Sequence, residues 1–176
     1  GDWSSDVCSS DLGGGALLRS LLRFPTIDPH LPRLAEHGAL PTVRAMALGA
    51  LIAGQARWPV GHGEVCIDKA YSLYRRVVLT ETRPLTVQTP AAEAIRMAAR
   101  DRSAMVRKLA ADGLAIHRAD LADMADFAEI AHRLADDASP AVRERAAFVL
   151  RGLEAASSPD RKSTRLNSSH RCISYA

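Results

Sequence analysis

The chain has 176 residues, with 23 basic and 20 acidic side chains and a net charge of +3. Hydrophobic residues make up 47% of it, which is too many for a disordered chain, and only 5% are aromatic. Many alanines and few aromatic residues favour close-packed helices over a β-sandwich or barrel. The longest apolar stretch, residues 45–53, is far shorter than a membrane span, so we expect no membrane partner.

The two ends differ in composition from the middle. Residues 2–12 and 160–176 resemble translations of the DNA adapters used in short-read sequencing, although natural Ser-rich tails are an alternative. We therefore expect adapter-like tails over 1–12 and 160–176 that contribute nothing to stability. Between them we expect one helical domain over 13–159, a fragment of a longer protein. This domain contains only one cysteine, Cys66, so no internal disulfide is expected.

In chain order, residues 16–24 predict a helix that ends at Pro25, and a short helix follows and stops at Gly38. Residues 40–51 predict a third helix. Proline and glycine over 57–63 predict a loop. Residues 64–79 predict a further helix, because apolar side chains recur there at helical spacing. These side chains are Ile67, Ala70, Tyr71, Tyr74, Val77 and Val78.

The second half contains an internal repeat. Residues 101–114 align without gaps to 137–150 at an offset of 36, and residues 40–51 form a weaker third copy. Each copy has the pattern of a helix, and further helices are predicted over about 90–100 and 120–135. A helix, a short turn and a second helix repeated at a fixed period form an α-solenoid unit. The sequence therefore predicts an all-α fold, a right-handed α-solenoid of antiparallel helix pairs with about seven helices.

The repeated pattern D-x-S-P-x-V-R-x-x-A-A-x-x-L, read at 137–150, resembles the HEAT-like repeats of bacterial proteins. The resemblance implies that the Val, Ala and Leu positions are core. It also implies that the turn Asp and helix Arg link successive repeats, in what we call the Arg–Asp ladder; anion-binding sites are the alternative interpretation. The ladder residues are Arg44, Asp101, Arg107, Asp137 and Arg143.

In HEAT-like solenoids the second helix of each pair lines the concave side, which implies a partner-binding ridge there. The ridge consists of Lys108, Asp112, Glu144, Phe148 and Arg151, and the earlier copy would add Ala45, Gly49 and Ile52. Phe148 stands where the pattern expects a polar residue. It is either a partner anchor or is covered by a further repeat.

Other candidate sites are weaker. His62, Glu64 and Cys66 alternate but have no fourth partner, so we expect no metal site, and Cys66 is expected to be an inert thiol. The carboxylates Asp123, Asp126 and Glu129 fit an exposed helix face. Exposed aromatic and basic residues could bind nucleic acid, although a buried helix stripe with a solvated edge explains them as well. These residues are Tyr71, Tyr74, Arg75 and Arg76.

No nucleotide-binding or catalytic motif is present in the sequence, so we expect no catalytic residue and no cofactor. Family members are mostly scaffolds, and a minority act on bilins or alkylated DNA. We expect a non-catalytic scaffold that binds a protein through its concave face. The alternatives are a nucleic-acid-binding solenoid, which the 11 bases and 12 acids of residues 81–159 disfavour, and a regulatory or lyase-associated arm of a larger enzyme. No signal peptide is visible, and we expect a cytoplasmic location.

Overall fold

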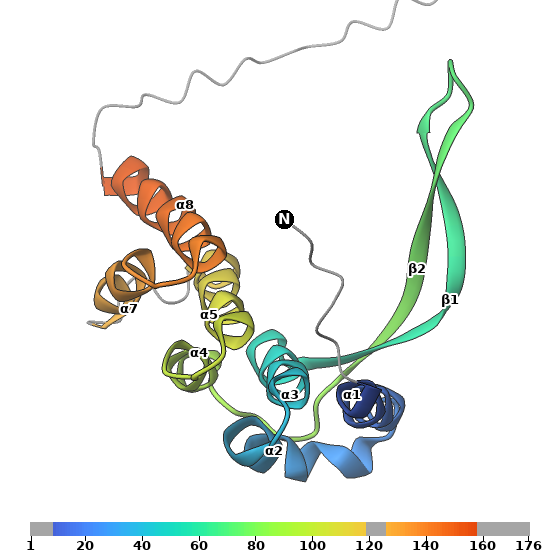
Figure 1. The fold of residues 1–176 in the computed structure, drawn as a ribbon, viewed down its shortest axis with the longest axis horizontal. Helices are drawn as coiled ribbons and strands as arrows, with labels where there is room; N and C mark the ends of the chain where they lie inside the picture. The colour runs from blue at the N-terminus through green and yellow to red at the C-terminus, as the bar shows by residue number, and fades with distance from the viewer. Residues whose placement is uncertain (1–8, 119–125, 158–176) are drawn as a thin grey trace, which may run out of the picture.

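The computed structural model describes residues 9–118 and 126–157 (Figure 1). These residues form seven α-helices, one 3₁₀ helix and two strands. In chain order they are α1 (Ser9–Leu21), η1 (Pro25–His30), α2 (Leu31–His37), α3 (Pro41–Ala53), β1 (Gln55–Asp68), β2 (Leu73–Pro84), α4 (Ala91–Ala99), α5 (Ala104–Ile116), α7 (Phe127–Ala135) and α8 (Pro140–Ser157).

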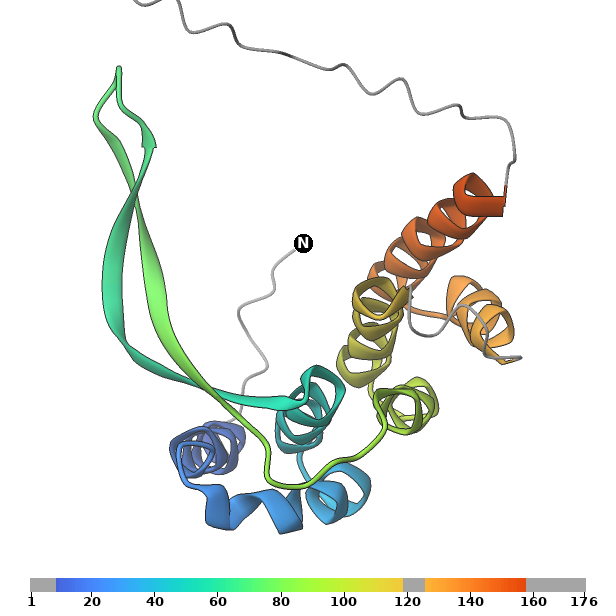
Figure 2. The ribbon, with the colours of Figure 1, turned by 180° about the vertical axis from the view of Figure 1, so that it is seen from behind.

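Six of the helices pack as three successive pairs, α2 with α3, α4 with α5 and α7 with α8. A short turn joins the two helices of each pair and reverses the direction of the chain. Figures 1 and 2 show the pairs arranged in a curve, with α3, α5 and α8 along its inner side and α2, α4 and α7 along its outer side. The inner helices also contact one another, α3 with α5 and α5 with α8.

One continuous core runs through the helical pairs, because each helix buries the apolar stripe of its sequence. On α8 the predicted core residues Val142, Ala146 and Val149 are buried. Small residues let the inner helices approach closely. A Cβ atom at Gly113 would lie 2.9 Å from Cγ1 of Ile95 and 3.1 Å from Cγ2 of Ile52, so only glycine fits where α5 meets α3 and α4.

Residues 55–84 form a long antiparallel β-hairpin, which we call the arm, and the predicted loop over 57–63 and helix over 64–79 are wrong. The arm extends away from the helices (Figures 1 and 2). The prediction of an all-α right-handed solenoid is therefore wrong as well, because the fold combines helices with a two-stranded sheet.

The physical reason for the hairpin lies in its residue types and its two ends. The stretch LYRRVVLTET in β2 is rich in aromatic and β-branched side chains, which favour strands. Gly54 ends α3 with a positive φ of 64° and turns the chain into β1. At the tip, Oδ1 of Asp68 accepts the N–H of Ala70 at 2.8 Å, and Ser72 takes a φ of 51°.

The base of the arm is tied to the N-terminal helices by a buried ion pair. Asp28 is fully buried and accepts hydrogen bonds from Arg83, Nη2 to Oδ1 at 2.6 Å and Nη1 to Oδ2 at 2.8 Å. The N–H and hydroxyl of Thr86 donate to Oδ2 of the same carboxylate at 2.8 and 2.9 Å. Arg83 also donates to the carbonyl oxygens of Leu22 and Phe24. With a further bond to the carbonyl oxygen of Pro84, all five N–H groups of Arg83 are used, and both carboxylate oxygens of Asp28 accept hydrogen bonds.

Some predicted boundaries differ from the observed ones. Helix α1 begins at Ser9, inside the predicted tail over 1–12, while residues 1–8 and 158–176 lie outside the described residues. The helix predicted over 120–135 is described only as α7, with Asp126 at its N-cap. Asp123 lies outside the described residues.

Replacing Asp28 should weaken the whole fold. Asp28→Asn keeps the shape of the side chain but leaves the Arg83 guanidinium without its counter-charge, so we expect a loss of about 3 kcal/mol in unfolding free energy. Asp68→Asn, at the exposed tip of the arm, is the matched control and should cost less than about 1 kcal/mol. Urea unfolding measures the loss of stability in both variants. Equal losses would contradict the role of the Asp28–Arg83 pair in holding the fold together.

The same pair predicts a pH dependence. The hydrogen bond from Arg83, helped by those from Thr86 and opposed by burial, lowers the pKa of Asp28 from 3.8 to about 2. Because the folded-state pKa lies below the unfolded one, the contribution is complete above the unfolded value and is lost as the pH falls towards 2. The stability difference between wild type and Asp28→Asn should therefore shrink by about 2 kcal/mol between pH 6 and pH 2. A constant difference would show that Asp28 titrates normally.

Candidate functional site

The first two arginines of the predicted Arg–Asp ladder each bind the aspartate of the following repeat through two hydrogen bonds. Arg44 donates from Nε to Oδ2 of Asp101 at 2.7 Å and from Nη2 to Oδ1 at 2.9 Å. Arg107 makes the same two bonds to Asp137, at 2.6 and 2.9 Å. Such bidentate pairs fix both the distance and the orientation of the two groups.

Each ladder arginine also closes the turn before its own helix through Nη1. Arg107 donates to the carbonyl oxygens of Asp101 at 3.0 Å and Arg102 at 2.9 Å, six and five residues before it. Arg44 and Arg143 make the equivalent bonds at the same sequence separations. The local geometry is therefore repeated three times. Within the described residues, Arg143 differs in having no carboxylate partner.

The aspartates of the ladder are held ionised. Burial raises the pKa of Asp101, but hydrogen bonds from Arg44 and the backbone N–H of Ser103 outweigh it, so the net pKa is lowered. The hydrogen bond from Arg107 lowers the pKa of Asp137 against the effect of burial. The N–H groups of Arg44 and Arg107 already donate to these carboxylates and to turn carbonyl oxygens. The two arginines are therefore poorly placed to bind an anion.

The predicted ridge residues on α5 and α8 are joined into one network by a residue that the sequence did not single out, Arg145. Its Nε donates to Oδ1 of Asp112 at 2.5 Å, and its guanidinium lies 5.1 Å from the centroid of the Phe148 ring. Asp112 also pairs with Lys108 at 3.5 Å. Phe148 remains 55% exposed, and Glu144 and Arg151 are exposed beside it.

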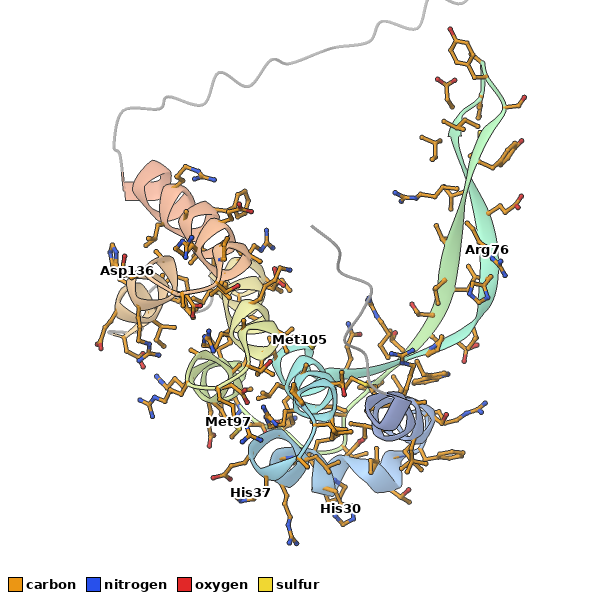
Figure 3. All side chains as sticks on the ribbon, in the orientation of Figure 1. His30, His37, Arg76, Met97, Met105 and Asp136 are labelled. Atoms are coloured by element: carbon orange, nitrogen blue, oxygen red, sulfur yellow. The ribbon has the colours of Figure 1, made fainter. Side chains whose placement is uncertain are left out.

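The ridge does not continue onto α3 as predicted. Ile52 is buried in the core opposite Gly113, and Ala45 and Gly49 are only half-exposed. Met105 extends the ridge on α5 instead, because it lies three and seven residues before Lys108 and Asp112 and is exposed. Figure 3 labels Met105 near the inner side of the curve, well away from Arg76 on the arm.

The aromatic and basic residues considered for nucleic acid lie in the arm. Tyr71 is 84% exposed at the tip, and Tyr74, Arg75 and Arg76 are exposed along β2. The alternative interpretation, that the tyrosines belong to the buried stripe of a helix, is therefore wrong.

The weaker candidates are placed as follows. His62, Glu64 and Cys66 lie along β1, and in the described parts of the chain no three His, Cys, Asp or Glu side chains come together to hold a metal ion. Cys66 is half-buried with a free thiol. Asp126 accepts two hydrogen bonds from Arg96, at 2.5 and 3.0 Å, and thereby links α4 to the start of α7.

An apolar groove of about 600 Å³ lies where the base of the arm meets α1, α3 and the end of α5. Trp58, Val78, Met46, Ala50 and Ile116 line it, with Arg19 and Arg57 among its polar residues. The indole Nε1 of Trp58 is buried without a hydrogen-bond acceptor in the described structure. No helix within the described residues is long and apolar enough to cross a membrane.

Comparison of the chain with models of known protein families, with curated proteins and with solved structures finds no match. The function must therefore be argued from the geometry of the ladder, the ridge and the arm.

The middle and last arginines of the ladder, Arg107 and Arg143, should respond differently to truncation to alanine. Arg107→Ala removes both the ion pair to Asp137 and the turn hydrogen bonds, so we expect a loss of about 2–3 kcal/mol in unfolding free energy. Arg143→Ala removes only turn hydrogen bonds at an exposed side chain and should cost about 1 kcal/mol. Chemical denaturation of both variants checks this order, and a larger loss for Arg143→Ala would reverse our interpretation.

Proposed function

We propose that this chain is a non-catalytic binding module that holds a protein partner on the ridge formed by Lys108, Asp112, Glu144, Phe148 and Arg151. In this proposal the three helical pairs are HEAT-like repeats that present the ridge on the inner side of the curve. The proposal also keeps a cytoplasmic location for the protein.

The observation that carries the proposal is the exposure of the Phe148 side chain. A large aromatic side chain that is 55% exposed on a charged helix face loses hydrophobic stabilisation unless another surface covers it. The cation–π contact with Arg145 and the bond from Arg145 to Asp112 hold the groups around Phe148 in place. A partner would therefore meet an aromatic anchor whose surroundings are already ordered, which lowers the entropy cost of binding.

The mixed charges around Phe148 support a protein over a polyanion. Lys108 and Arg151 are balanced by Asp112 and Glu144, so the five ridge residues carry no net charge, and Arg145 beside them adds a single positive charge. A nucleic acid surface needs a continuous basic track to release counterions from phosphates. A protein surface with an apolar pocket and complementary charges at its rim fits the ridge better.

The test compares capture by immobilised full-length wild type, Phe148→Asp and Leu17→Asp. Leu17 is the matched control, because it is 62% exposed but lies on α1, away from the ridge. A true ridge partner should bind Phe148→Asp about 30-fold more weakly, as for a hot-spot residue, and Leu17→Asp as well as wild type. If every captured protein binds Phe148→Asp at full strength, the ridge is not the binding surface.

A second candidate function, nucleic acid binding, is favoured by one observation, the exposure of Tyr71, Tyr74, Arg75 and Arg76 on the arm. Aromatic rings could stack on bases and the arginines could pair with phosphates. The acids Glu64 and Asp68 in the same stretch offset most of this charge.

Binding of a labelled DNA duplex at increasing salt tests this candidate. We expect at most weak binding, with a dissociation constant above about 10 μM at 0.15 M salt, because few phosphates can be neutralised. A much tighter interaction that falls steeply with salt and is lost in Arg75→Glu would favour nucleic acid over the ridge proposal.

A further inference from the structure

The arm carries the largest group of exposed large hydrophobic residues in the described structure. Of the fourteen large hydrophobic residues that are exposed within the described ranges 9–118 and 126–157, eight lie in the arm, which consists of only 30 residues. They are Val60, Val65, Ile67, Tyr71, Leu73, Tyr74, Val78 and Leu79. Only the base of the arm packs against helices, α1 and α3. Beyond its base the arm is a two-stranded ribbon without a packed layer, which is only marginally stable in water, so we expect another surface to cover it.

The two edges of the arm differ in their ability to pair with another strand. Along β1 the ladder skips Val60 and Ile67, so this strand carries two bulges, and Pro59 has no N–H to donate. Bulges and proline are features that protect an edge from pairing. Along β2 every residue from Leu73 to Pro84 is paired in an unbroken series, and residues 73–83 contain neither glycine nor proline. The free edge of β2 is therefore regular and lacks the bulges and proline that interrupt β1.

We infer that this free edge is a dimer interface, at which β2 pairs antiparallel with β2 of a second copy of the chain. The resulting sheet would have four strands, in the order β1–β2–β2′–β1′. Because a twofold axis perpendicular to the sheet relates the two copies, each residue faces one whose side chain points to the same side.

The sequence of β2 favours one register for this pairing. When the axis passes through Val78, the midpoint of 73–83, Arg75 of each copy lies opposite Glu81 of the other. Val77 of each copy lies opposite Leu79 of the other, and Val78 lies opposite Val78 of the other copy. Centring the pairing on Arg76 would oppose like charges, and centring it on Val77 or Leu79 leaves Arg75 without an acid. The register that uses the full edge is thus also the one with complementary charges.

Such a pairing closes on itself. Once β2 is covered, the outer edges of the four-stranded sheet are the two β1 strands, whose bulges and Pro59 oppose further addition. The assembly should therefore stop at two copies instead of growing into a fibre.

Charge exchange at the interface tests the inference without breaking the hairpin. Within one copy Arg75 pairs with Val65 and Glu81 with Trp58, so neither takes part in a cross-strand ion pair of its own arm. Arg75→Glu or Glu81→Arg would place like charges opposite each other twice in each dimer. The double variant Arg75→Glu/Glu81→Arg would restore both attractive pairs.

Sedimentation equilibrium of the full chain from about 1 to 100 μM should show a dimer with a micromolar or tighter dissociation constant. Each single variant should weaken the dimer at least about tenfold, and the double variant should recover it. An equimolar mixture of the two single variants should form a heterodimer. Arg57→Glu, an exposed change on β1, is the control and should leave the dimer intact.

A wild-type chain that stays monomeric over this range, or assembles beyond two copies, would overturn the inference. So would single variants that dimerise like wild type, because another surface would then form the contact. Phe148→Asp should not change the dimer, which separates this inference from the proposed ridge: either can fail without the other.

Discussion

The bidentate pair between an arginine of one helical repeat and the turn aspartate of the next is the contact on which the rest of the array depends. In each pair the arginine also binds carbonyl oxygens of the turn that precedes its own helix. The aspartate of each pair likewise accepts a backbone N–H in its own turn, from Ser103 for Asp101 and from Ser139 for Asp137. One set of hydrogen bonds thus shapes each turn and fixes the spacing between repeats, so the inner helices line up and α5 and α8 bring the ridge residues together.

The arm is inserted between Arg44 and Asp101 without changing the geometry of the contact between them. Arg107 and Arg143 are 36 residues apart, whereas Arg44 and Arg107 are 63 apart, an excess of 27 residues. The pair between Arg44 and Asp101 nevertheless has nearly the same geometry as that between Arg107 and Asp137. The arm leaves the array after α3 and returns before α4, and the buried pair of Arg83 with Asp28 fixes its base. The helical stack and the arm therefore present two separate surfaces.

The sequence predicts the repeated helices well, because Val106 and Val142 start apolar stripes with the same period and both are buried. It does not predict the arm. The apolar positions of 64–79 fit a helical spacing, and a ribbon that is exposed on both faces lacks the polar–apolar alternation that marks a half-buried strand. The excess of 27 residues between copies and the β-branched run in β2 are the signals that could have revealed it. Arg145 was missed because the repeat aligns it with Leu109, a half-buried apolar residue.

A double-mutant cycle on Arg44 and Asp101 tests the central contact most directly. Their side chains are only 4% and 11% exposed, so solvent screens this pair less than any exposed ion pair. Unfolding free energies of Arg44→Ala, Asp101→Ala and the double variant give the coupling between the two side chains. We predict a coupling of about 2 kcal/mol, together with a double variant little less stable than either single one. A coupling below about 0.5 kcal/mol, with additive losses, would contradict the account.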